Sequence, residues 1–408
     1  MRQSNAKTDV LIAGAGIPGL TLALALARAL KPNFSATVCD SSLGFEPAAD
    51  DRVSAITASG RHMLMALGIW PKIKAGAEPV HEMIITDSKL EDAVRPTFIS
   101  FGEEAEAGEP LAHIVEHRAL IVALREAAAA EGVELLAQPV QGFERESEFV
   151  SVAFGEHSRA AKLLVAADGA RSKLRAQAKI SSVSADYKQL GIVATIGHER
   201  EHKGIATQHF LPAGTFATLP LTGKRSSIVW AEEADEARRL VALPPDQFKK
   251  ELIRRFGLKL GGIEVLSKVR AFPLSLSIAR SFTGERFALL GDAAHVIHPL
   301  AGQGLNLGLR DAAALAESIS DAARLGLDPG GPDVLKRYER WRRSDTVAMA
   351  GATDGLNRLF SNQSDALRML RDVGLGVVER APKLKEFFMH EAAGTGGEAP
   401  KLMRGEVL

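Results

Sequence analysis

Hydrophobic positions follow two different periods along the chain, and each change of period marks a new element. Residues 9–13 (DVLIA) form a short apolar run, whereas residues 17–30 keep apolar side chains on one face at helical spacing. A second apolar run, ATVC at 36–39, comes next. This order predicts a strand, a helix and a second strand at the start of the chain, which is a βαβ unit.

Later segments repeat the same two periods. The runs AAKLLVA and RFALL predict apolar strands that end near an acid, at Asp168 and Asp292. The stretches GIVATIGH, TFATLPL and SSIVWAE alternate and predict a second sheet. The pattern is helical from residue 335 onward and after Gly302, where one buried face is expected through Leu305, Leu309, Ala312, Ala313 and Ala316.

The turn after the first strand has the spacing G-x-G-x-x-G, with Gly14, Gly16 and Gly19. In a dinucleotide-binding βαβ unit the first glycine permits the turn, the second lets a pyrophosphate approach the backbone, and the third lets helix and strand pack closely. Asp40, about 20 residues further on, ends the second strand and is placed to accept hydrogen bonds from an adenosine ribose. The alternative is a glycine turn that only packs a βαβ unit; strand, helix, strand and acid together favour nucleotide binding.

Composition and charge exclude several classes of function. The 408 residues include 50 acidic and 50 basic side chains, so no overall field draws the chain to nucleic acid or to an anionic bilayer. The single Cys39 excludes an internal disulfide, and no residues have zinc-ligand spacing, so no metal site and a reducing, cytoplasmic compartment are expected. The apolar run at 11–30 resembles a signal peptide or membrane helix, but Arg28 and the glycines argue against both.

The segment LLGDAAHVIHPLAGQGLNLGLRD, residues 289–311, places an acid after a strand and small residues before a helix. The acid, Asp292, can accept hydrogen bonds from a sugar-like polyol. The first turn of the following helix presents backbone amides and a partial positive charge, which suits a group that gains negative charge. A reduced flavin ring is such a group, so we expect Asp292 at the ribityl chain and the helix start at the isoalloxazine.

The motifs GAGIPG, ADGARSKLR and GDAAHVIHPLAGQGLNLGLRDA, in this order, resemble those of the FAD-dependent aromatic hydroxylases, which are single-component flavoprotein monooxygenases. The segments DDRVSAITASGRHMLMALGIW, HIVEHRALIVAL and GATDGLNRLFS make the chain most similar to the ubiquinone-biosynthesis hydroxylases. The resemblance implies an α/β fold of the para-hydroxybenzoate hydroxylase type, with a Rossmann-like FAD-binding domain, an interleaved β-sheet substrate domain and a C-terminal helical segment. The expected boundaries are 1–75, 110–180 and 269–334 for the FAD-binding domain, 76–109 and 181–268 for the substrate domain, and 335–408 for the helical region.

The resemblance also implies roles for single residues. It assigns the adenosine-diphosphate site to Gly14, Gly16, Gly19 and Asp40, and the ribityl contact to Asp292. It implies further flavin contacts for Arg52, Arg118, Asp168 and Gly169, and for the loop under the isoalloxazine, which is Gly302, Gln303, Gly304, Leu305 and Asn306. No second G-x-G-x-x-G is present for NAD(P)H, in agreement with a family whose reductant docks transiently.

The expected chemistry is that of the cofactor. NAD(P)H reduces FAD, O2 adds to the reduced flavin, and a phenol ring attacks the distal oxygen of the flavin C4a-hydroperoxide. An apolar pocket must keep water away from that species. Pro299 is implied to lie against the flavin beside the substrate, Arg52 is the expected charge partner, and His298 is a candidate proton acceptor. For His295 a structural hydrogen bond is the favoured interpretation.

The resemblance implies a polyprenyl phenol of ubiquinone biosynthesis as substrate. Thr218, Leu219 and Pro220 are expected to face its pocket from the second sheet, with an ordinary sheet turn as an equal alternative. The amphipathic helices after residue 335 normally pack on their own protein; contact with the inner membrane surface or with other ubiquinone-pathway enzymes is the sharper interpretation. The alternative functions are a hydroxylase of a small soluble aromatic compound and a flavoprotein that acts as a structural or interaction subunit.

Overall fold

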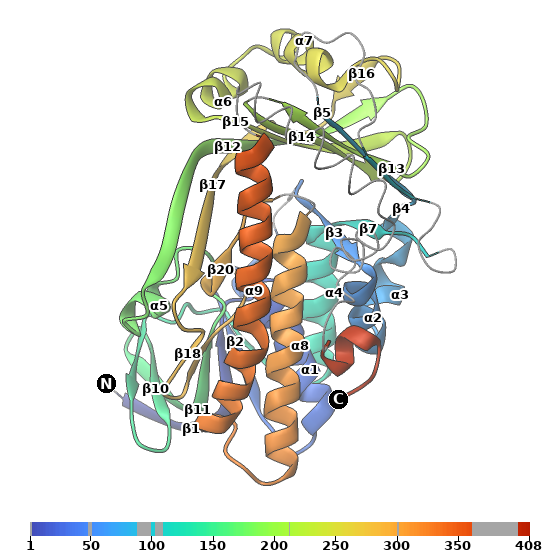
Figure 1. The fold of residues 1–408 in the computed structure, drawn as a ribbon. Coiled ribbons are helices and arrows are strands. Elements are labelled where there is room, and N and C mark those ends of the chain that lie inside the picture. Colours follow the sequence, from blue (N-terminus) through green and yellow to red (C-terminus); the bar gives the residue numbers. More distant parts are fainter. Residues whose placement is uncertain are drawn as a thin grey trace.

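The computed structural model describes residues 2–47, 51–87, 99–102, 109–211, 213–299, 302–360 and 399–408. These residues form a lower layer, which contains both ends of the chain, and an upper layer capped by two short helices (Figure 1). A ribbon of two long strands and one long helix run between the layers (Figure 1). The two layers correspond to the two sheets that the hydrophobic patterns predict.

The lower sheet has a parallel centre, as the βαβ pattern predicts. In its central strands, residues 10–13, 36–39, 163–166 and 287–289 are almost completely buried, which is typical of a parallel sheet covered on both faces. Their order is β19 (Phe287–Leu289), β11 (His157–Ala166), β1 (Arg2–Ala13), β2 (Ala36–Cys39) and β8 (Glu134–Leu136). The antiparallel strands that extend the sheet are β9 (Gly142–Arg145), β10 (Val150–Phe154) and β18 (Thr283–Gly284).

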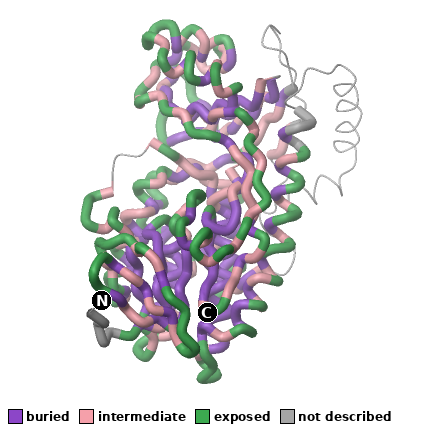
Figure 2. The backbone as a smooth tube through the Cα atoms, turned by 90° about the vertical axis from the view of Figure 1, so that its left-hand side faces the viewer, coloured by how far each residue is buried: buried purple, intermediate pink, exposed green. Residues whose placement is uncertain are grey.

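The main core lies where helices pack on this sheet, and it forms the densest buried region in Figure 2. Helix α1 (Ile17–Leu30) lies between α4 (His117–Ala130) and α8 (Gln303–Arg324), and α9 (Pro332–Phe360) packs on α8. A small sheet beside them consists of β3 (Val53–Thr57), β7 (Ala112–Glu116) and β4 (Glu78–Val80). The shorter helices of this layer are η1 (Ser41–Gly44), α2 (Ala58–Ala66), α3 (Trp70–Ile73), η2 (Lys74–Gly76), α5 (Lys173–Gln177), η4 (Gly291–Ala293) and η6 (Lys401–Arg404).

The upper sheet is mostly antiparallel. Its order is β20 (His295–Val296), β17 (Arg270–Ala279), β12 (Ser182–His198), β15 (Arg225–Glu233), β14 (Gly214–Leu221), β13 (Ile205–Leu211), β5 (Glu82–Asp87) and β6 (Ile99–Gly102), with β16 (Ile263–Val265) beside β12. Helices α6 (Ala234–Val241) and α7 (Pro245–Phe256) cover one face. We call the opposite face, which is turned toward the lower layer, the inner face (Figure 1).

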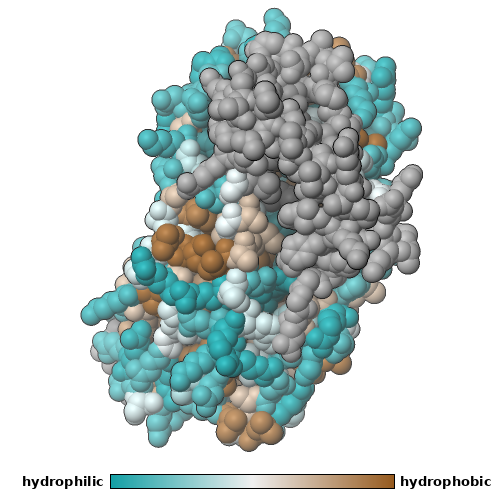
Figure 3. Space-filling model, in the orientation of Figure 1, coloured by the Kyte–Doolittle hydropathy of each residue, from teal (hydrophilic) through white to brown (hydrophobic). Residues whose placement is uncertain are grey.

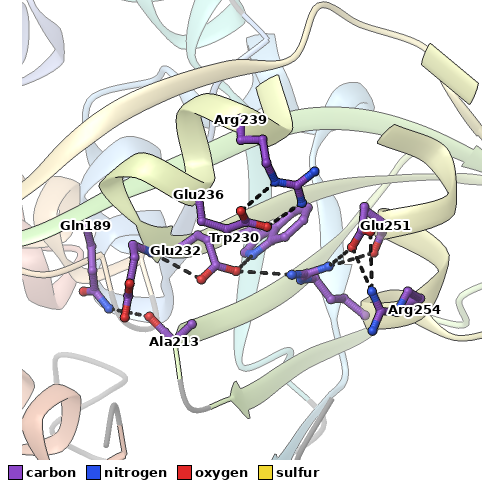
Figure 4. A network of polar contacts seen from close by, with 10 residues as sticks. Gln189, Ala213, Trp230, Glu232, Glu236, Arg239, Glu251 and Arg254 are labelled. Atoms are coloured by element: carbon purple, nitrogen blue, oxygen red, sulfur yellow. Dashed lines mark hydrogen bonds and ion pairs between the residues drawn. The ribbon is translucent and has the colours of Figure 1, made fainter. Parts of the chain in front are cut away.

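A buried arginine, Arg255, holds α7 on the outer face of this sheet; Figure 4 labels its partners Trp230, Glu232 and Glu251. The Arg255 guanidinium lies 4.1 Å from the centre of the Trp230 ring and contacts two carboxylates, Glu232 at 3.3 Å and Glu251 at 2.8 Å. The Trp230 indole nitrogen also donates to Glu232, at 3.1 Å. These contacts fix α7 against the sheet through one cation.

Two expected boundaries differ from the sheets that the structure contains. Strand β17 lies after residue 268 but pairs with β12 of the upper sheet, and β4 lies within 76–109 but pairs with β7 beside the lower sheet. The expected helix at 366–388 lies outside the described residues. None of the described helices is long and apolar enough to cross a membrane.

Candidate functional site

Four residues predicted from the sequence follow the carboxyl ends of adjacent parallel strands. The register places Ala13 of β1 opposite Cys39 of β2 and Ala166 of β11, and it places Ala166 opposite Leu289 of β19. The segments that follow therefore leave the sheet at one edge, which is where open parallel sheets bind ligands. In the order β2, β1, β11 and β19 these segments carry Asp40, Gly14, Asp168 and Asp292.

The glycine turn between β1 and α1 contains two positions needed for packing and one that is open. A Cβ on Gly14 would overlap the Ala167 carbonyl, and a Cβ on Gly19 would overlap the Gly14 carbonyl. Gly16 is exposed. The nearest group to a Cβ placed there would be the Pro18 ring, at 4.0 Å. Gly16 therefore leaves its backbone accessible to a ligand.

Asp40 closes this turn from the neighbouring strand. Its Oδ2 accepts a hydrogen bond from the Ala15 amide at 2.9 Å, and its Oδ1 accepts one from the Ser42 amide at 2.8 Å. An ionised carboxylate has about four acceptor sites, so Asp40 retains capacity for further donors. The ribose contact stays a prediction that this geometry permits.

Pro18 of α1 packs against the η4 turn and the start of α8, and so joins them to the glycine turn. A Cβ on Gly291 would lie 3.3 Å from the Pro18 Cγ, and one on Gly308 would lie 2.9 Å from it. Gly291 belongs to the η4 turn and Gly308 to α8, which packs beside α1. The glycine turn, the turn that carries Asp292 and the start of α8 therefore lie together.

Asp292 is the exposed residue of the η4 turn, between buried Gly291 and Ala293. Although solvent reaches its side chain, surrounding protein raises the pKa of this carboxyl by burial, while the nearby His295 and Arg52 lower it. Arg52 is exposed just before β3. The structure thus brings two predicted site residues, Arg52 and Asp292, within electrostatic range.

Asn306 joins the start of α8 to β3. Its Nδ2 donates to the carbonyls of Ala55, at 2.8 Å, and Gly302, at 3.2 Å. Its Oδ1 accepts from the amide and the hydroxyl of Thr57, both at 3.2 Å. These protein contacts occupy the Asn306 side chain, so a cofactor can use its backbone more readily than its amide group.

The rest of the predicted flavin loop forms an accessible helix start. Gly302 caps α8 with a left-handed φ of 65°, Gln303 is buried, and Leu305 is half-buried. A Cβ on Gly304 would meet nothing within 4 Å. Gly304 therefore provides at α8 the open backbone that Gly16 provides at α1. Both helix starts present amides without intrahelical partners, which favour an anionic group.

Two further predicted contacts lie near this edge. The amide of His117 donates to the Arg52 carbonyl at 3.0 Å. Arg118, the next residue, is exposed in the first turn of α4, so the backbones of the two arginines lie close together. Asp168 is exposed, and its carboxylate accepts a long 3.4 Å hydrogen bond from the Leu174 amide. The flavin roles of Arg118, Asp168 and Gly169 stay predictions.

The two histidines before α8 have different environments. His295 is buried, and its Nε2 lies 2.6 Å from an Asp311 carboxylate oxygen, in keeping with a structural hydrogen bond. His298 has no exposed surface, and neither of its ring nitrogens has a hydrogen-bond partner within the described chain. Its ring meets the Tyr187 ring edge to face at 5.1 Å, and burial lowers the pKa of His298 to about 4. Pro299, the next residue, is exposed.

Strand β14 turns only one of its three predicted substrate residues to the inner face. Phe216 and Ile228 belong to the cluster under α6 and α7, and Thr218 pairs with Ile228, so Thr218 and Pro220 lie on that outer face. Leu219 points inward and packs against a small apolar cluster that Val53 and Ala55 of β3 also contact. Of Thr218, Leu219 and Pro220, only Leu219 therefore remains a candidate for the pocket.

Two polar groups behind the site were not predicted from the sequence. Asp311, in α8, holds His295 and the amide of Gly291, and Arg342 of α9 holds Asp311 in turn. Tyr187 of β12 packs on His298 and donates to Asp354 of α9 at 3.0 Å. A charged residue in the buried alanine face of α8 was the available signal for Asp311; Tyr187 carried none.

The arrangement fits an extended dinucleotide of the FAD type. Acids follow β2, β11 and β19, where sugar hydroxyls need acceptors, and open glycines stand at the starts of α1 and α8, where phosphate and flavin need close backbone approach. Within the described residues no group of histidine, cysteine or acidic side chains has the arrangement of a metal site.

Comparison with known proteins agrees with this geometry. Residues 7–352 match the family model described as an FAD binding domain. The ubiquinone hydroxylase UbiL of Rhodospirillum rubrum is 42% identical over 98% of this chain and 93% of its own length. The 3-demethoxyubiquinol 3-hydroxylase of Escherichia coli is 33% identical over 96% of this chain and its full length, 100%. The ubiquinone biosynthesis monooxygenase COQ6 of Drosophila melanogaster is 30% identical over 95% and 90%.

Solved structures share the fold at low sequence identity. The p-nitrophenol 4-monooxygenase PnpA of Pseudomonas putida superposes with a TM-score of 0.77 at 18% identity, covering 96% of this chain and 99% of its own. PqsL of Pseudomonas aeruginosa, described as a probable FAD-dependent monooxygenase, gives 0.75 at 21% identity, covering 91% and 99%. These neighbours confirm the mixed α/β fold expected from the sequence.

Proposed function

Because this chain belongs to the ubiquinone hydroxylases, a family of FAD-dependent monooxygenases, we propose that it hydroxylates the aromatic ring of a polyprenylated phenol, using NAD(P)H and O2. The chain is an FAD-dependent oxidoreductase that serves ubiquinone synthesis. The proposal adds the substrate class and the residues that act on it. One observation supports it most directly: acids and open glycines stand together at the carboxyl edge of the parallel sheet, in a chain that is 42% identical to a ubiquinone hydroxylase.

Bound FAD supplies the redox chemistry, because no side chain can activate O2 by itself. The protein binds and orients it: Gly16 and Gly304 admit the cofactor to two helix starts, and Asp40 and Asp292 accept from its sugar-like hydroxyls. Arg52, near Asp292, provides a positive charge beside the ring system. Asp168 and Arg118 complete the polar edge.

On the substrate side the protein excludes water and holds the ring. Leu219 packs on an apolar cluster that also includes residues of β4 and β7, and Pro299 is an exposed rigid side chain beside the start of α8. A dry, apolar environment suits both a prenylated ring and an oxygen-transfer step that water would quench. Pro299 and Leu219 are the proposed substrate contacts.

His298 is the proposed acceptor of the phenolic proton. Its ring is neutral near pH 7, because burial lowers its pKa to about 4, and a neutral imidazole has one free acceptor nitrogen. A buried polar group without a partner is uncommon in folded proteins, and a substrate hydroxyl would supply that partner. The nearby Asp354 carboxylate favours the protonated ring.

Three further features belong to the proposal. Either NADH or NADPH serves as the transient reductant, since the described chain contains one dinucleotide edge. Peripheral contact with the inner membrane surface would bring the prenylated substrate to a cytoplasmic enzyme. Apolar surface between the two layers is visible in Figure 3, and Val347 of α9 is among the exposed large apolar residues. Such surface suits a membrane or another ubiquinone-pathway enzyme.

The quinone profile of a strain lacking this gene tests the function. We expect a prenylated intermediate that lacks one ring hydroxyl to accumulate, and re-expression of the chain to restore ubiquinone, as measured by mass spectrometry of lipid extracts. Unchanged ubiquinone would reject the assignment. Restoration by a variant that retains no flavin would favour a structural role instead.

An assay of the purified enzyme separates the two substrate classes. A prenylated phenol should stimulate NAD(P)H oxidation with little hydrogen peroxide, because oxygen transfer then outcompetes decay. The alternative, a hydroxylase of small soluble aromatic compounds, predicts that a hydroxybenzoate stimulates tightly coupled oxidation and that prenylated phenols do not.

A further inference from the structure

Behind the proposed flavin edge lies a buried chain of charges that the function described so far does not use. Asp311 of α8 has no exposed surface, and Arg342 of α9 is 2% exposed. The Arg342 Nε donates to Asp311 at 2.8 Å, and its guanidinium also contacts Asp345 at 2.5 Å. Arg310 contacts the same Asp345 oxygen at 2.8 Å. Negative and positive groups thus alternate along a chain of four side chains at the interface of α8 and α9.

The free end of this chain holds the turn that carries Asp292. The Asp311 Oδ2 accepts from the Gly291 amide at 3.2 Å and lies 2.6 Å from the His295 Nε2. Gly291 and His295 bracket Asp292 by one residue on one side and three on the other. Asp311 therefore contacts both ends of the turn and leaves the Asp292 side chain directed to the exposed edge.

Other side chains hold the same turn at its remaining backbone positions. The Tyr338 hydroxyl of α9 donates to the Leu289 carbonyl at 2.7 Å, and Arg175 of α5 donates to the Ala293 carbonyl at 2.7 Å. The Arg175 contact is also charge-assisted but comes from a half-buried side chain, whereas Asp311 is a fully buried ionised group with two contacts to the turn. Hydrogen bonds to charged groups are stronger than neutral ones. Burial alone would raise the pKa of Asp311, but His295 and Arg342 together keep it below its usual value, so the group stays ionised.

We propose that Asp311, held by Arg342, is a positioning residue that acts through Asp292 to set the affinity of this chain for FAD. A residue that acts through another gives no additional effect once that other residue is removed. The proposal rests on the proposed ribityl contact of Asp292. It does not require that the substrate be a prenylated phenol.

A double-mutant cycle on FAD affinity tests the proposal. Purified apoprotein is titrated with FAD and followed by flavin fluorescence, without turnover. We expect Asp292→Ala and Asp311→Asn each to raise the dissociation constant at least about tenfold, as supporting groups behind a binding site commonly do. The double variant should bind within twofold of Asp292→Ala alone. A product of the two single effects, or an unchanged affinity in either single variant, would overturn the proposal.

A matched control comes from the same pair of helices. Asp321 of α8 forms a 2.8 Å ion pair with Arg337 of α9, but both side chains are partly exposed and neither contacts the turn. Asp321→Asn should leave FAD affinity within twofold of the parent. Equal weakening by Asp321→Asn would mean that general α8–α9 packing, rather than the Asp292 turn, controls binding.

The cycle remains decisive if Asp311→Asn does not fold. Arg342→Lys retains a cation against Asp311 but contacts one carboxylate in place of two, and it enters the same cycle. Far-UV circular dichroism establishes which variants are folded before titration. If the FAD titrations show the coupling but deletion of the gene leaves ubiquinone unchanged, the proposed function is rejected and this inference is still supported.

Discussion

Gly16 and Gly19 stand three residues apart in one turn, and their surroundings predict opposite effects of the same substitution. Gly19→Ala places a methyl group on the Gly14 carbonyl, which is backbone and cannot move aside, so we expect about 1–3 kcal/mol of destabilisation. Gly16→Ala meets open space and should leave apoprotein stability nearly unchanged, but the methyl group should weaken FAD binding at least tenfold. Urea unfolding and FAD titration separate the two effects. Normal FAD affinity in Gly16→Ala would contradict close approach at that position.

His298 should make the protein sensitive to acid. Burial lowers the pKa of His298 in the folded protein to about 4, whereas a histidine in the unfolded chain has a pKa of about 6.5. As pH falls, the unfolded chain therefore takes up the proton first. The contribution of neutral His298 to the free energy of unfolding is complete above the unfolded pKa and is lost as pH falls from there to about 4. About 2 kcal/mol of this contribution is lost by pH 5. His298→Phe, which can keep the contact with Tyr187, should remove this part of the loss.

The measurement is urea unfolding of the parent and His298→Phe at pH 7.5 and pH 5. His113, whose pKa burial also lowers, remains in both proteins and cancels in the comparison. Exposed His157→Gln is the control, since an exposed imidazole has no burial to lose. Equal acid sensitivity of parent and His298→Phe would show that the His298 ring is hydrated or paired.

The position of a residue in the fold was predictable from the sequence where a motif fixes the backbone, although its ligand role stays a prediction, and it was not predictable where the face of a strand had to be chosen. The glycines and the acids after strands are tied to turns whose geometry their spacing requires. Thr218 and Pro220 differ from Leu219 by one residue each, and one residue reverses the face of a strand. Asp311 lies 16 residues from His295, so no local pattern joined them.

At the scale of elements, Arg255 joins α7 to the upper sheet through Glu232 and Trp230. Arg255→Met leaves Glu232 buried without its cation, although burial already raises the pKa of that carboxyl and eases its protonation. We expect the loss in unfolding free energy to approach the roughly 3–5 kcal/mol typical of a broken buried pair. The double variant Arg255→Met/Glu232→Gln should recover part of that loss. Thermal and urea unfolding measure both.

Helix α6, which lies beside α7 on the same face of the sheet, supplies the control for this prediction. Arg239 contacts Glu236 at 2.6 Å with an exposed arginine and a half-buried glutamate, so Arg239→Met should have little effect on Tm. Comparable losses for Arg239→Met and Arg255→Met would mean that the outer helices depend on surface charge rather than on the buried cation.

Element boundaries were less predictable than element types. Alternation identified the strands of the upper sheet, but it does not say which strand pairs with which. Strand β17 pairs with β12, about 80 residues earlier, and so belongs to the upper sheet although the nucleotide motifs follow it directly. Tertiary pairing over such distances leaves no local pattern in a sequence.

At the scale of the whole molecule, the site exists only because distant segments meet at one sheet edge. The order β2, β1, β11, β19 spans three strand spacings of about 4.8 Å each, so groups from residues 14–40 and 289–306 lie along one sheet edge, where the proposed FAD site extends. The three acid-terminated strands were readable from the sequence, which is why the fold and cofactor were predictable. The substrate contacts were less predictable, because the inner face of the upper sheet carries no motif.

Hydrogen exchange can test this convergence with two ligands. ADP occupies only the part of the site at β1, β2 and α1, so it should slow amide exchange there and leave η4 and the first turn of α8 unchanged. FAD should slow exchange at both, because one molecule then contacts segments more than 270 residues apart in the chain. In Asp292→Ala, ADP protection should persist while FAD protection at η4 decreases. Protection of the glycine turn alone by FAD would mean that the cofactor does not extend across the strand ends, and the placement of Asp292 and of the α8 start would fail with it.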